Sequence, residues 1–279
     1  MSKAGPRRII LCADDYGFAP GVNRAIRDLI EAKRINATSV MVTGPAISRH
    51  EAEALKASTS SHSACAIGLH VTLTAPLQPL TAHFKPLAGE AFLPMPALLR
   101  AALLRKLDRS ALFAELQAQL SAFRSLFGRE PDYVDGHQHV QLFPQIRDAF
   151  VTAVKQDAPQ AWVRQCGRSP TARRGTSPKA LLLDGLSRTF RQRCTATGVS
   201  FNPGFAGAYD MVRGADYGSA FSGFLDGLPD GGVVMCHPGF VDDTLRRIDN
   251  VTDQREREFA FFKSDDFLAT LRSAEVILT

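Results

Sequence analysis

Short apolar segments alternate with amphipathic segments along most of the chain. The first apolar segment spans residues 8–13, and the apolar positions of residues 22–30 then recur every three or four residues, which predicts a strand followed by a helix. Most of the apolar segments lack strict alternation, as is typical of parallel strands covered by helices on both faces. We expect the other strands at residues 39–43, 66–73, 133–139, 161–166, 199–202, 232–236 and 275–278.

This order of elements predicts an α/β fold with about seven or eight mostly parallel strands, arranged as a distorted, TIM-like (β/α) barrel rather than an open doubly wound sheet. Residues 112–127 predict a further helix that ends at Gly128. We find no internal repeat and no low-complexity linker, so we assign residues 1–279 to one domain. Within it, residues 75–112, which begin with a proline-rich stretch, and residues 167–196 are expected to be loop or lid insertions.

The composition is that of an ordinary globular protein. Of 279 residues, 45% are hydrophobic and 22% are charged, which excludes disordered, collagen-like and coiled-coil chains. The net charge is +5, and the chain has no basic run of the length that nucleic-acid-binding arms have, so we expect no nucleic-acid partner. The basic excess is concentrated in residues 167–196, where seven Lys or Arg residues stand against one acid, Asp184.

The five cysteines form no CxxC pair and mostly stand beside apolar residues, so we expect them to be reduced and buried. The N-terminal apolar run is too short for a signal peptide, and no stretch reaches the roughly 18 apolar residues of a membrane span. We therefore expect a cytoplasmic protein.

Polar side chains follow several of the predicted strands at the end where α/β proteins bind ligands. Asp14 and Asp15 come directly after the first strand. Strand alternation would point them to opposite sides of the backbone, so that one binds a metal ion while the other accepts a proton. Alternatively, one of them caps the following helix.

Histidines mark three further strand ends. His70 is either a hydrogen-bonded core residue or a ligand. If residues 133–139 form one strand, then Asp135, His137 and His139 share a face and form a ligand set suited to zinc or a similar ion. His237 precedes a Pro-Gly turn, where it is placed for general acid or base work or for a structural role. One Asp with two His from separate strands leaves coordination positions open to water, as in catalytic zinc sites.

Together these clusters resemble the YdjC family of carbohydrate deacetylases, which includes ChbG-like and HpnK-like proteins. The order and spacing of the motifs carry the resemblance over most of the chain. The motifs are Ala13-Asp14-Asp15-Tyr16-Gly17 with Gly21-Val22-Asn23, Thr38-Ser39-Val40-Met41-Val42, Ile67-Gly68-Leu69-His70, Leu126-Phe127-Gly128-Arg129-Glu130-Pro131, Asp135-Gly136-His137-Gln138-His139-Val140, Phe143-Pro144-Gln145-Ile146, Val234-Met235-Cys236-His237-Pro238-Gly239-Phe240, and Arg255-Glu256-Arg257-Glu258 with Ser264.

The resemblance implies a distorted (β/α) barrel that hydrolyses the N-acetyl group of an amino sugar with a divalent metal ion, zinc or magnesium. Matched by position, Asp15, His70 and His137 would be the metal ligands, Asp14 the catalytic base and His237 the acid.

We place Asp135, His139 and Arg164 near the substrate or around the ligands. His139 is an alternative to His137 as the third ligand. Arg164 would orient Asp14 or bind substrate oxygens, unless it lies in a solvated loop.

Two other functions use the same features. A phosphoesterase would use the same metal site, although the chain lacks a glycine-rich phosphate loop. A non-catalytic carbohydrate- or lipid-binding barrel would bind sugar without turnover. For the deacetylase, the substrate is a chitooligosaccharide or a lipid-linked sugar such as a glycosylated hopanoid. The basic amphipathic segment 97–107 is either a packed helix or a peripheral contact with the inner membrane face. The resemblance also implies a homodimer.

Overall fold

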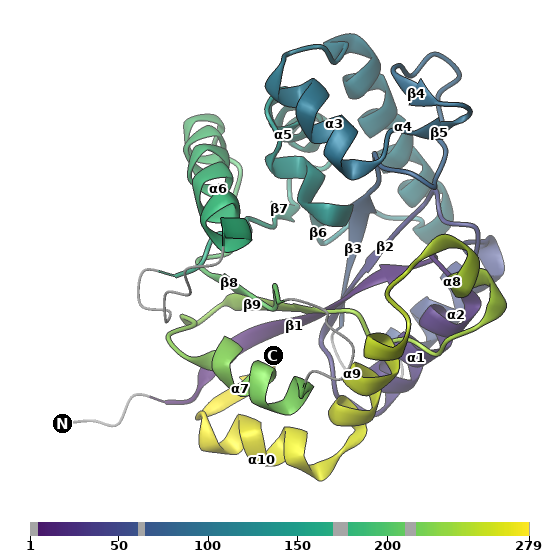
Figure 1. Cartoon of the computed structure of the whole chain (residues 1–279). Coiled ribbons are helices and arrows are strands. Elements are labelled where there is room, and N and C mark those ends of the chain that lie inside the picture. The colour runs from purple at the N-terminus through teal and green to yellow at the C-terminus, as the bar shows by residue number, and fades with distance from the viewer. Residues whose placement is uncertain (1–4, 61–64, 170–177, 210–215, 279) are drawn as a thin grey trace.

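The computed structural model describes residues 5–60, 65–169, 178–209 and 216–278. Its centre is a curled parallel sheet in the order β7-β6-β3-β2-β1-β9-β8, and β10 pairs in parallel with the first residues of β1 (Figure 1). The strands are β1 (Arg7–Tyr16), β2 (Ala37–Val40), β3 (Ala66–Val71), β6 (Tyr133–Gly136), β7 (Trp162–Val163), β8 (Phe205–Ala206), β9 (Gly232–Cys236) and β10 (Val276–Leu278). The predicted distorted (β/α) barrel is confirmed.

Helices surround the sheet, and α3, α4, α5 and α6 lie in the upper half of Figure 1, where Phe150 of α5 contacts Phe190 of α6. The helices are α1 (Pro20–Glu31), α2 (Arg49–Ser60), α3 (Met95–Leu103), α4 (Arg109–Phe127), α5 (Ile146–Asp157), α6 (Pro178–Thr197), α7 (Tyr217–Leu225), α8 (Asp243–Ile248), α9 (Asp253–Lys263) and α10 (Asp265–Ser273). Helix α4 is capped at its start by Asp108, whose side chain accepts from two backbone N–H groups, and at its end by Gly128 with φ 71°. The predicted end of this helix is confirmed.

The sheet curls so far that its two edge strands, β7 and β8, come close together, and residues 201–206 connect them. Phe201 forms a parallel bridge with Val163 of β7, while Phe205 of β8 pairs with Val233 of β9. The strand predicted at residues 199–202 is reduced to this single bridge, because Pro203 follows it and has no N–H to continue the ladder. The curl brings the carboxyl ends of β1, β3, β6 and β9 toward one another.

The two proposed insertions hold secondary structure. A short hairpin, β4 (Leu87–Ala88) and β5 (Ala91–Phe92), and helix α3 lie within residues 75–112. All of residues 178–196 lie in α6, whereas Arg173 and Arg174 of the basic region fall outside the described residues. Leu98 and Ala102 pack the inner side of α3, so the segment 97–107 contains a partly packed helix.

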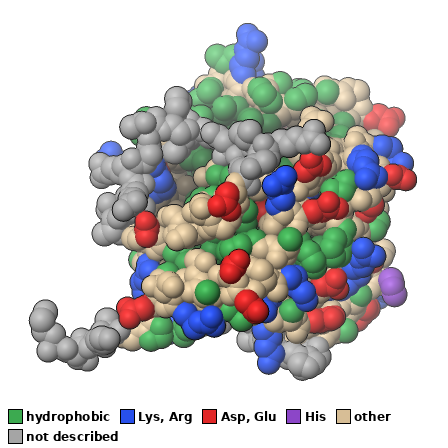
Figure 2. All heavy atoms as spheres, turned by 60° about the horizontal axis from the view of Figure 1, so that its bottom comes forward, with side chains coloured by type: hydrophobic (Ala, Val, Ile, Leu, Met, Phe, Trp, Pro, Cys, Tyr) green, Lys and Arg blue, Asp and Glu red, His purple; other side chains and the backbone are tan. Residues whose placement is uncertain are grey.

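One face of the molecule is mixed in charge. On the face that Figure 2 brings forward, the lower side of Figure 1, acidic and basic side chains are interspersed. Across the described ranges, no helix has both the length and the apolar character needed to cross a membrane.

Candidate metal centre and active site

The four polar clusters of the sequence meet in one pocket of about 290 Å³ at the carboxyl ends of the strands. The residues that line it are Asp14, Asp15, His70, Met95, Leu99, Gly136, His137, Gln138, His139, Phe143, Leu182, Leu183, Leu186, Met235, His237, Asp249, Val251 and Arg255. Segments far apart in the sequence therefore share one cavity.

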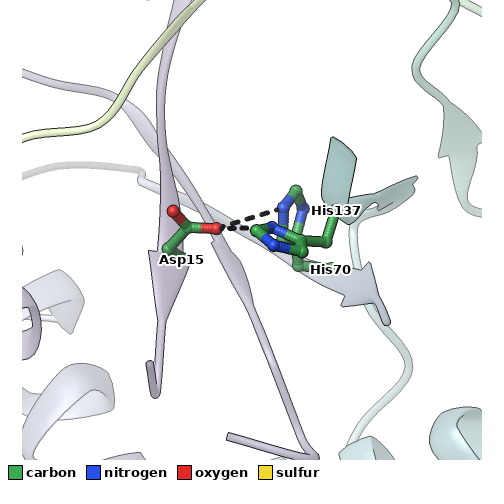
Figure 3. Close-up of side chains that lie close together, drawn as sticks. All are labelled: Asp15, His70 and His137. Atoms are coloured by element: carbon green, nitrogen blue, oxygen red, sulfur yellow. Dashed lines mark hydrogen bonds and ion pairs between the residues drawn. The ribbon is translucent and has the colours of Figure 1, made fainter. Parts of the chain in front are cut away.

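Asp15, His70 and His137 all line this pocket, and their side chains point toward one another (Figure 3). Asp15 Oδ1 lies 3.4 Å from His70 Nε2 and 3.1 Å from His137 Nδ1. The three donor atoms lie within 4.8 Å of one another, and one carboxylate with two imidazoles suits a divalent ion. By this chemistry, the residues present fit the metal that the resemblance implies.

Asp15 reaches this position through a bulge. Its φ is 72°, and the pairing of β1 with β2 shifts between Ala13 and Tyr16, so that β1 holds one extra residue there. The prediction that strand alternation points Asp14 and Asp15 to opposite sides is wrong, because both line the pocket. A left-handed backbone that Asp tolerates better than most residues turns the second carboxylate toward the histidines.

His70 is oriented by Asp135, its direct neighbour across the β3–β6 pairing. Asp135 Oδ1 lies 2.5 Å from His70 Nδ1, which leaves Nε2 facing Asp15. Burial alone would lower the pKa of His70, but the carboxylates of Asp135 and Asp14 outweigh it and raise this pKa to about 10. A carboxylate on the far nitrogen is the usual support of a metal-binding histidine, so Asp135 lies behind the ligand group.

The strand predicted at residues 133–139 is shorter than expected. β6 ends at Gly136, and His137–Leu142 form a 3-10 helix in which Gln138 and His139 have φ of 54° and 60°. The prediction that residues 135, 137 and 139 share one face is therefore wrong, because the left-handed residues interrupt the alternation. His139 Nδ1 lies 3.4 Å from Cys166 Sγ, whereas His137 lies beside Asp15.

Asp14 is clamped by Arg164. Arg164 Nη1 and Nη2 lie 2.8 and 2.7 Å from the two oxygens of Asp14, and Nη2 also lies 2.7 Å from Asp135 Oδ2. Arg164 is fully buried, so the alternative of a solvated loop is wrong. Burial is the largest single influence and would raise the pKa of Asp14, but Arg164 together with His70 and His237 lowers this pKa below its usual range, so Asp14 stays ionised at neutral pH.

A second group of possible metal donors lies next to this pair. Cys12, Asp14 and Asp135 also have donor atoms within 4.8 Å of one another. Both carboxylates already share the Arg164 guanidinium, and burial raises the pKa of the Cys12 thiol well above its usual value. The guanidinium therefore supplies the positive charge that a metal ion would bring there.

His237 follows β9 and lines the pocket. Its backbone N–H donates to Glu258 Oε2 at 2.5 Å, and among the described residues its Nδ1 atom has no hydrogen-bond partner. Burial lowers the pKa of this histidine to about 4, although Asp15 and Asp14 act in the opposite direction. His237 is therefore neutral at pH 7, and it donates a proton only after it has received one.

Sequence reasoning gave no role to two buried residues of α9. Arg255 Nη2 donates to Asp15 Oδ2 at 2.7 Å, and Glu258 accepts from the Tyr209 hydroxyl and from the His237 backbone. Burial raises the pKa of Glu258 to about 7. Both residues belong to the C-terminal motif at 255–258, and their spacing of three on one helix was the available signal.

Comparison with known proteins agrees with the motif pattern. The family model described as YdjC-like protein matches residues 8–273. A protein from Enterococcus faecalis named for cellobiose-phosphate cleavage is similar in structure, with a TM-score of 0.76 at 18% identity, and the match covers 99% of this chain and 97% of that one. A lactam utilization protein from Thermus thermophilus gives a TM-score of 0.55 at 16% identity, covering 97% and 98%. At these identities, the two likenesses concern the fold.

Proposed function

The chain belongs to the YdjC-like protein family, and on that premise we propose that it is a metal-dependent hydrolase that removes the N-acetyl group from an N-acetylglucosamine-type sugar. Membership of the family supports a carbohydrate deacetylase-type hydrolase. One observation carries the proposal further: a three-donor group, Asp15 with His70 and His137, lies in the same pocket as a buried, ionised carboxylate that is not part of that group, Asp14.

Asp15, His70 and His137 would hold the ion. Two nitrogen donors with one oxygen favour zinc over magnesium, which prefers oxygen ligands. A bound divalent ion polarises a carbonyl oxygen and lowers the pKa of water, which is the chemistry that amide hydrolysis needs.

The residues around the ion would handle the protons. Asp14 Oδ1 already accepts hydrogen bonds from Arg164, Ser39 and Cys12. Among the described residues, Asp14 Oδ2 accepts one hydrogen bond, from Arg164. Oδ2 therefore keeps a lone pair to take the proton of the attacking water. His237, neutral in the free site, would receive the proton that Asp14 takes from the attacking water and pass it to the departing amine.

The walls of the pocket bear on the choice of sugar. Helix α3 contributes Met95 and Leu99, and α6 contributes Leu182, Leu183 and Leu186. Met95 and Leu182 are 36% and 51% exposed, which leaves apolar surface uncovered at the site. This favours a substrate whose sugar carries an apolar group, so a lipid-linked N-acetylglucosamine is proposed ahead of a chitooligosaccharide. Peripheral membrane contact and a homodimer stay predictions.

The test is acetate release after the protein has been stripped with a chelator and reloaded with zinc. The substrates are N-acetylated chitooligosaccharides, a lipid-linked N-acetylglucosamine and, for the alternative phosphoesterase, a model phosphomonoester. We expect metal-dependent acetate release, with the lipid-linked sugar preferred. His70→Ala should lose bound zinc and acetate release together, whereas His83→Ala, at an exposed histidine, should lose neither.

Three results would contradict the proposal. Full activity in excess chelator would remove the role of the metal. Phosphate release without acetate release would identify the phosphoesterase. Sugar binding without turnover under every divalent ion would identify a binding protein.

A further inference from the structure

We propose that Arg255 is a positioning residue that confines Asp15 to a single metal-facing oxygen, Oδ1, and holds that oxygen beside His70 and His137. The inference rests on the metal site of the proposed function and concerns how this chain shapes that site. Arg255 belongs to the C-terminal motif at residues 255–258, in which the sequence alone assigned it no role.

The guanidinium of Arg255 divides the two oxygens of Asp15 between different partners. Nη2 of Arg255 lies 2.7 Å from Asp15 Oδ2, while Oδ1 is the atom that faces both histidines. A free carboxylate can bind a metal ion through one oxygen or through both. A charge-assisted hydrogen bond of this length on Oδ2 leaves Oδ1 as the one available donor.

Arg255 is itself fixed from several sides. Nη2 also lies 2.8 Å from Asp249 Oδ2, and Nε donates to the Val251 carbonyl at 3.1 Å. Its guanidinium carbon lies 5.9 Å from the centre of the Phe18 ring. The side chain is 3% exposed, and the left-handed φ of Asp15 separately sets the direction in which its carboxylate leaves the backbone. The orientation of Asp15 is therefore determined by two independent constraints.

Charge and geometry make opposite predictions for Arg255. As a nearby positive charge, Arg255 repels a metal cation, so on charge alone its removal should tighten metal binding. If Arg255 instead acts by positioning Asp15, then altering Arg255 should weaken metal binding. Arg255→Lys separates the two effects, because lysine keeps the charge but lacks the planar fork that reaches Asp15, Asp249 and the Val251 carbonyl together.

The experiment measures zinc affinity by titration calorimetry and the visible absorption of bound cobalt(II), which depends on coordination number. The variants are Arg255→Lys and the milder Asp249→Asn, which removes a support of Arg255 without touching Asp15. The matched control is Arg129→Lys, because Arg129 holds Asp132 by two hydrogen bonds of 2.8 and 2.9 Å on the surface. Thermal unfolding establishes that each variant is folded.

We expect Arg255→Lys to weaken zinc binding by about 10- to 100-fold, as altered supports of metal ligands generally do. Its cobalt absorption should fall per ion, because a released Oδ2 raises the coordination number. Asp249→Asn should show a smaller loss in the same direction, and Arg129→Lys none. A merely structural role would lower the melting temperature without changing the cobalt spectrum of the folded protein.

Unchanged zinc affinity with an unchanged cobalt spectrum in folded Arg255→Lys overturns the inference, as does tighter zinc binding. If Arg255→Lys does not fold, the same two readings on Asp249→Asn decide. A wild-type protein that binds zinc but releases no acetate would end the deacetylase proposal and leave this inference intact. A wild-type protein that binds neither zinc nor cobalt would end both.

Discussion

Asp14 and Asp15 are adjacent in the chain, and each meets a buried arginine, but the two sides of the pocket treat them differently. On the β7 side, Arg164 bonds both oxygens of Asp14 and also pairs with Asp135. On the α9 side, Arg255 bonds one oxygen of Asp15 and leaves the other facing two histidines.

The difference shows how two adjacent aspartates can present their carboxylate oxygens to different partners. Burial would raise the pKa of both carboxylates, but the arginines and the neighbouring histidines together lower it below the usual range, so both are ionised at neutral pH. Their geometry then separates them, since Asp15 Oδ1 faces His70 and His137 whereas both oxygens of Asp14 face Arg164. Glu258, which has no hydrogen bond from an arginine among the described contacts, shows the opposite shift, with burial raising its pKa to about 7.

Neutralising each aspartate separately tests this division of roles most directly. Asp14→Asn should keep zinc and lose acetate release by about 10²- to 10⁴-fold, the usual contribution of a general base. Asp15→Asn should lose zinc binding and, with it, acetate release. Calorimetry and an acetate assay on the same preparations measure both quantities. If Asp14→Asn lost zinc as completely as Asp15→Asn, the division of roles between the two would be wrong.

The sheet was predictable from the sequence because buried parallel strands are apolar on both faces, a local pattern that the segments at residues 8–13 and 232–236 show clearly. The end of helix α4 was predictable for the same kind of reason, since Gly128 supplies the left-handed residue that closes a helix.

The details that place the side chains were not predictable from periodicity. Strand alternation failed at Asp15 and again after Gly136, because at both places left-handed residues turn the chain out of the regular strand. Alternation describes a regular strand, and functional side chains tend to lie where the strand stops being regular. The motif pattern nevertheless selected His70 and His137, which the structure brings beside Asp15.

Local reasoning gave Arg255 no role, and it offered the pairing of Arg164 with Asp14 only as one of several alternatives. Arg164 and Arg255 lie 150 and 240 residues from the aspartates they bind. Nothing in the neighbourhood of Arg164 distinguishes a buried arginine from a solvated one, and its burial follows from the curl of the whole sheet.

A second prediction concerns the stability that the Arg164 side contributes. Arg164→Gln leaves the carboxylates of Asp14 and Asp135 buried without their shared positive charge, which should lower the free energy of unfolding by about 3–5 kcal/mol. Arg129→Gln, at an exposed ion pair, should cost less than about 1 kcal/mol. Urea unfolding at pH 7 compares them. Adding Asp135→Asn to Arg164→Gln should recover part of the loss, and equal costs for the two arginine variants would contradict the structure of this side.

The smallest expected effect concerns Glu258, the buried carboxylate that accepts no hydrogen bond from an arginine among the described contacts. The pKa of Glu258 is raised to about 7 in the folded protein, so the folded state binds a proton that the unfolded state has already released near neutral pH. The stability this gives is fully present below the unfolded pKa of about 4.3 and is lost as pH rises through 7. Between pH 5 and 8, wild-type protein should therefore lose about 2–3 kcal/mol relative to Glu258→Gln, which does not titrate.

Glu256→Gln is the matched control for this measurement, because Glu256 lies on the same helix and also accepts from a backbone N–H, that of Val241 at 3.1 Å, but is exposed. Unfolding free energies of Glu256→Gln and wild-type protein should stay parallel over this pH range, while those of Glu258→Gln and wild-type protein diverge. Parallel curves for Glu258→Gln as well would mean that Glu258 is ionised in the folded protein at pH 5. In that case, the lack of a hydrogen bond from an arginine would not explain why the pKa of Glu258 differs from those of Asp14 and Asp15.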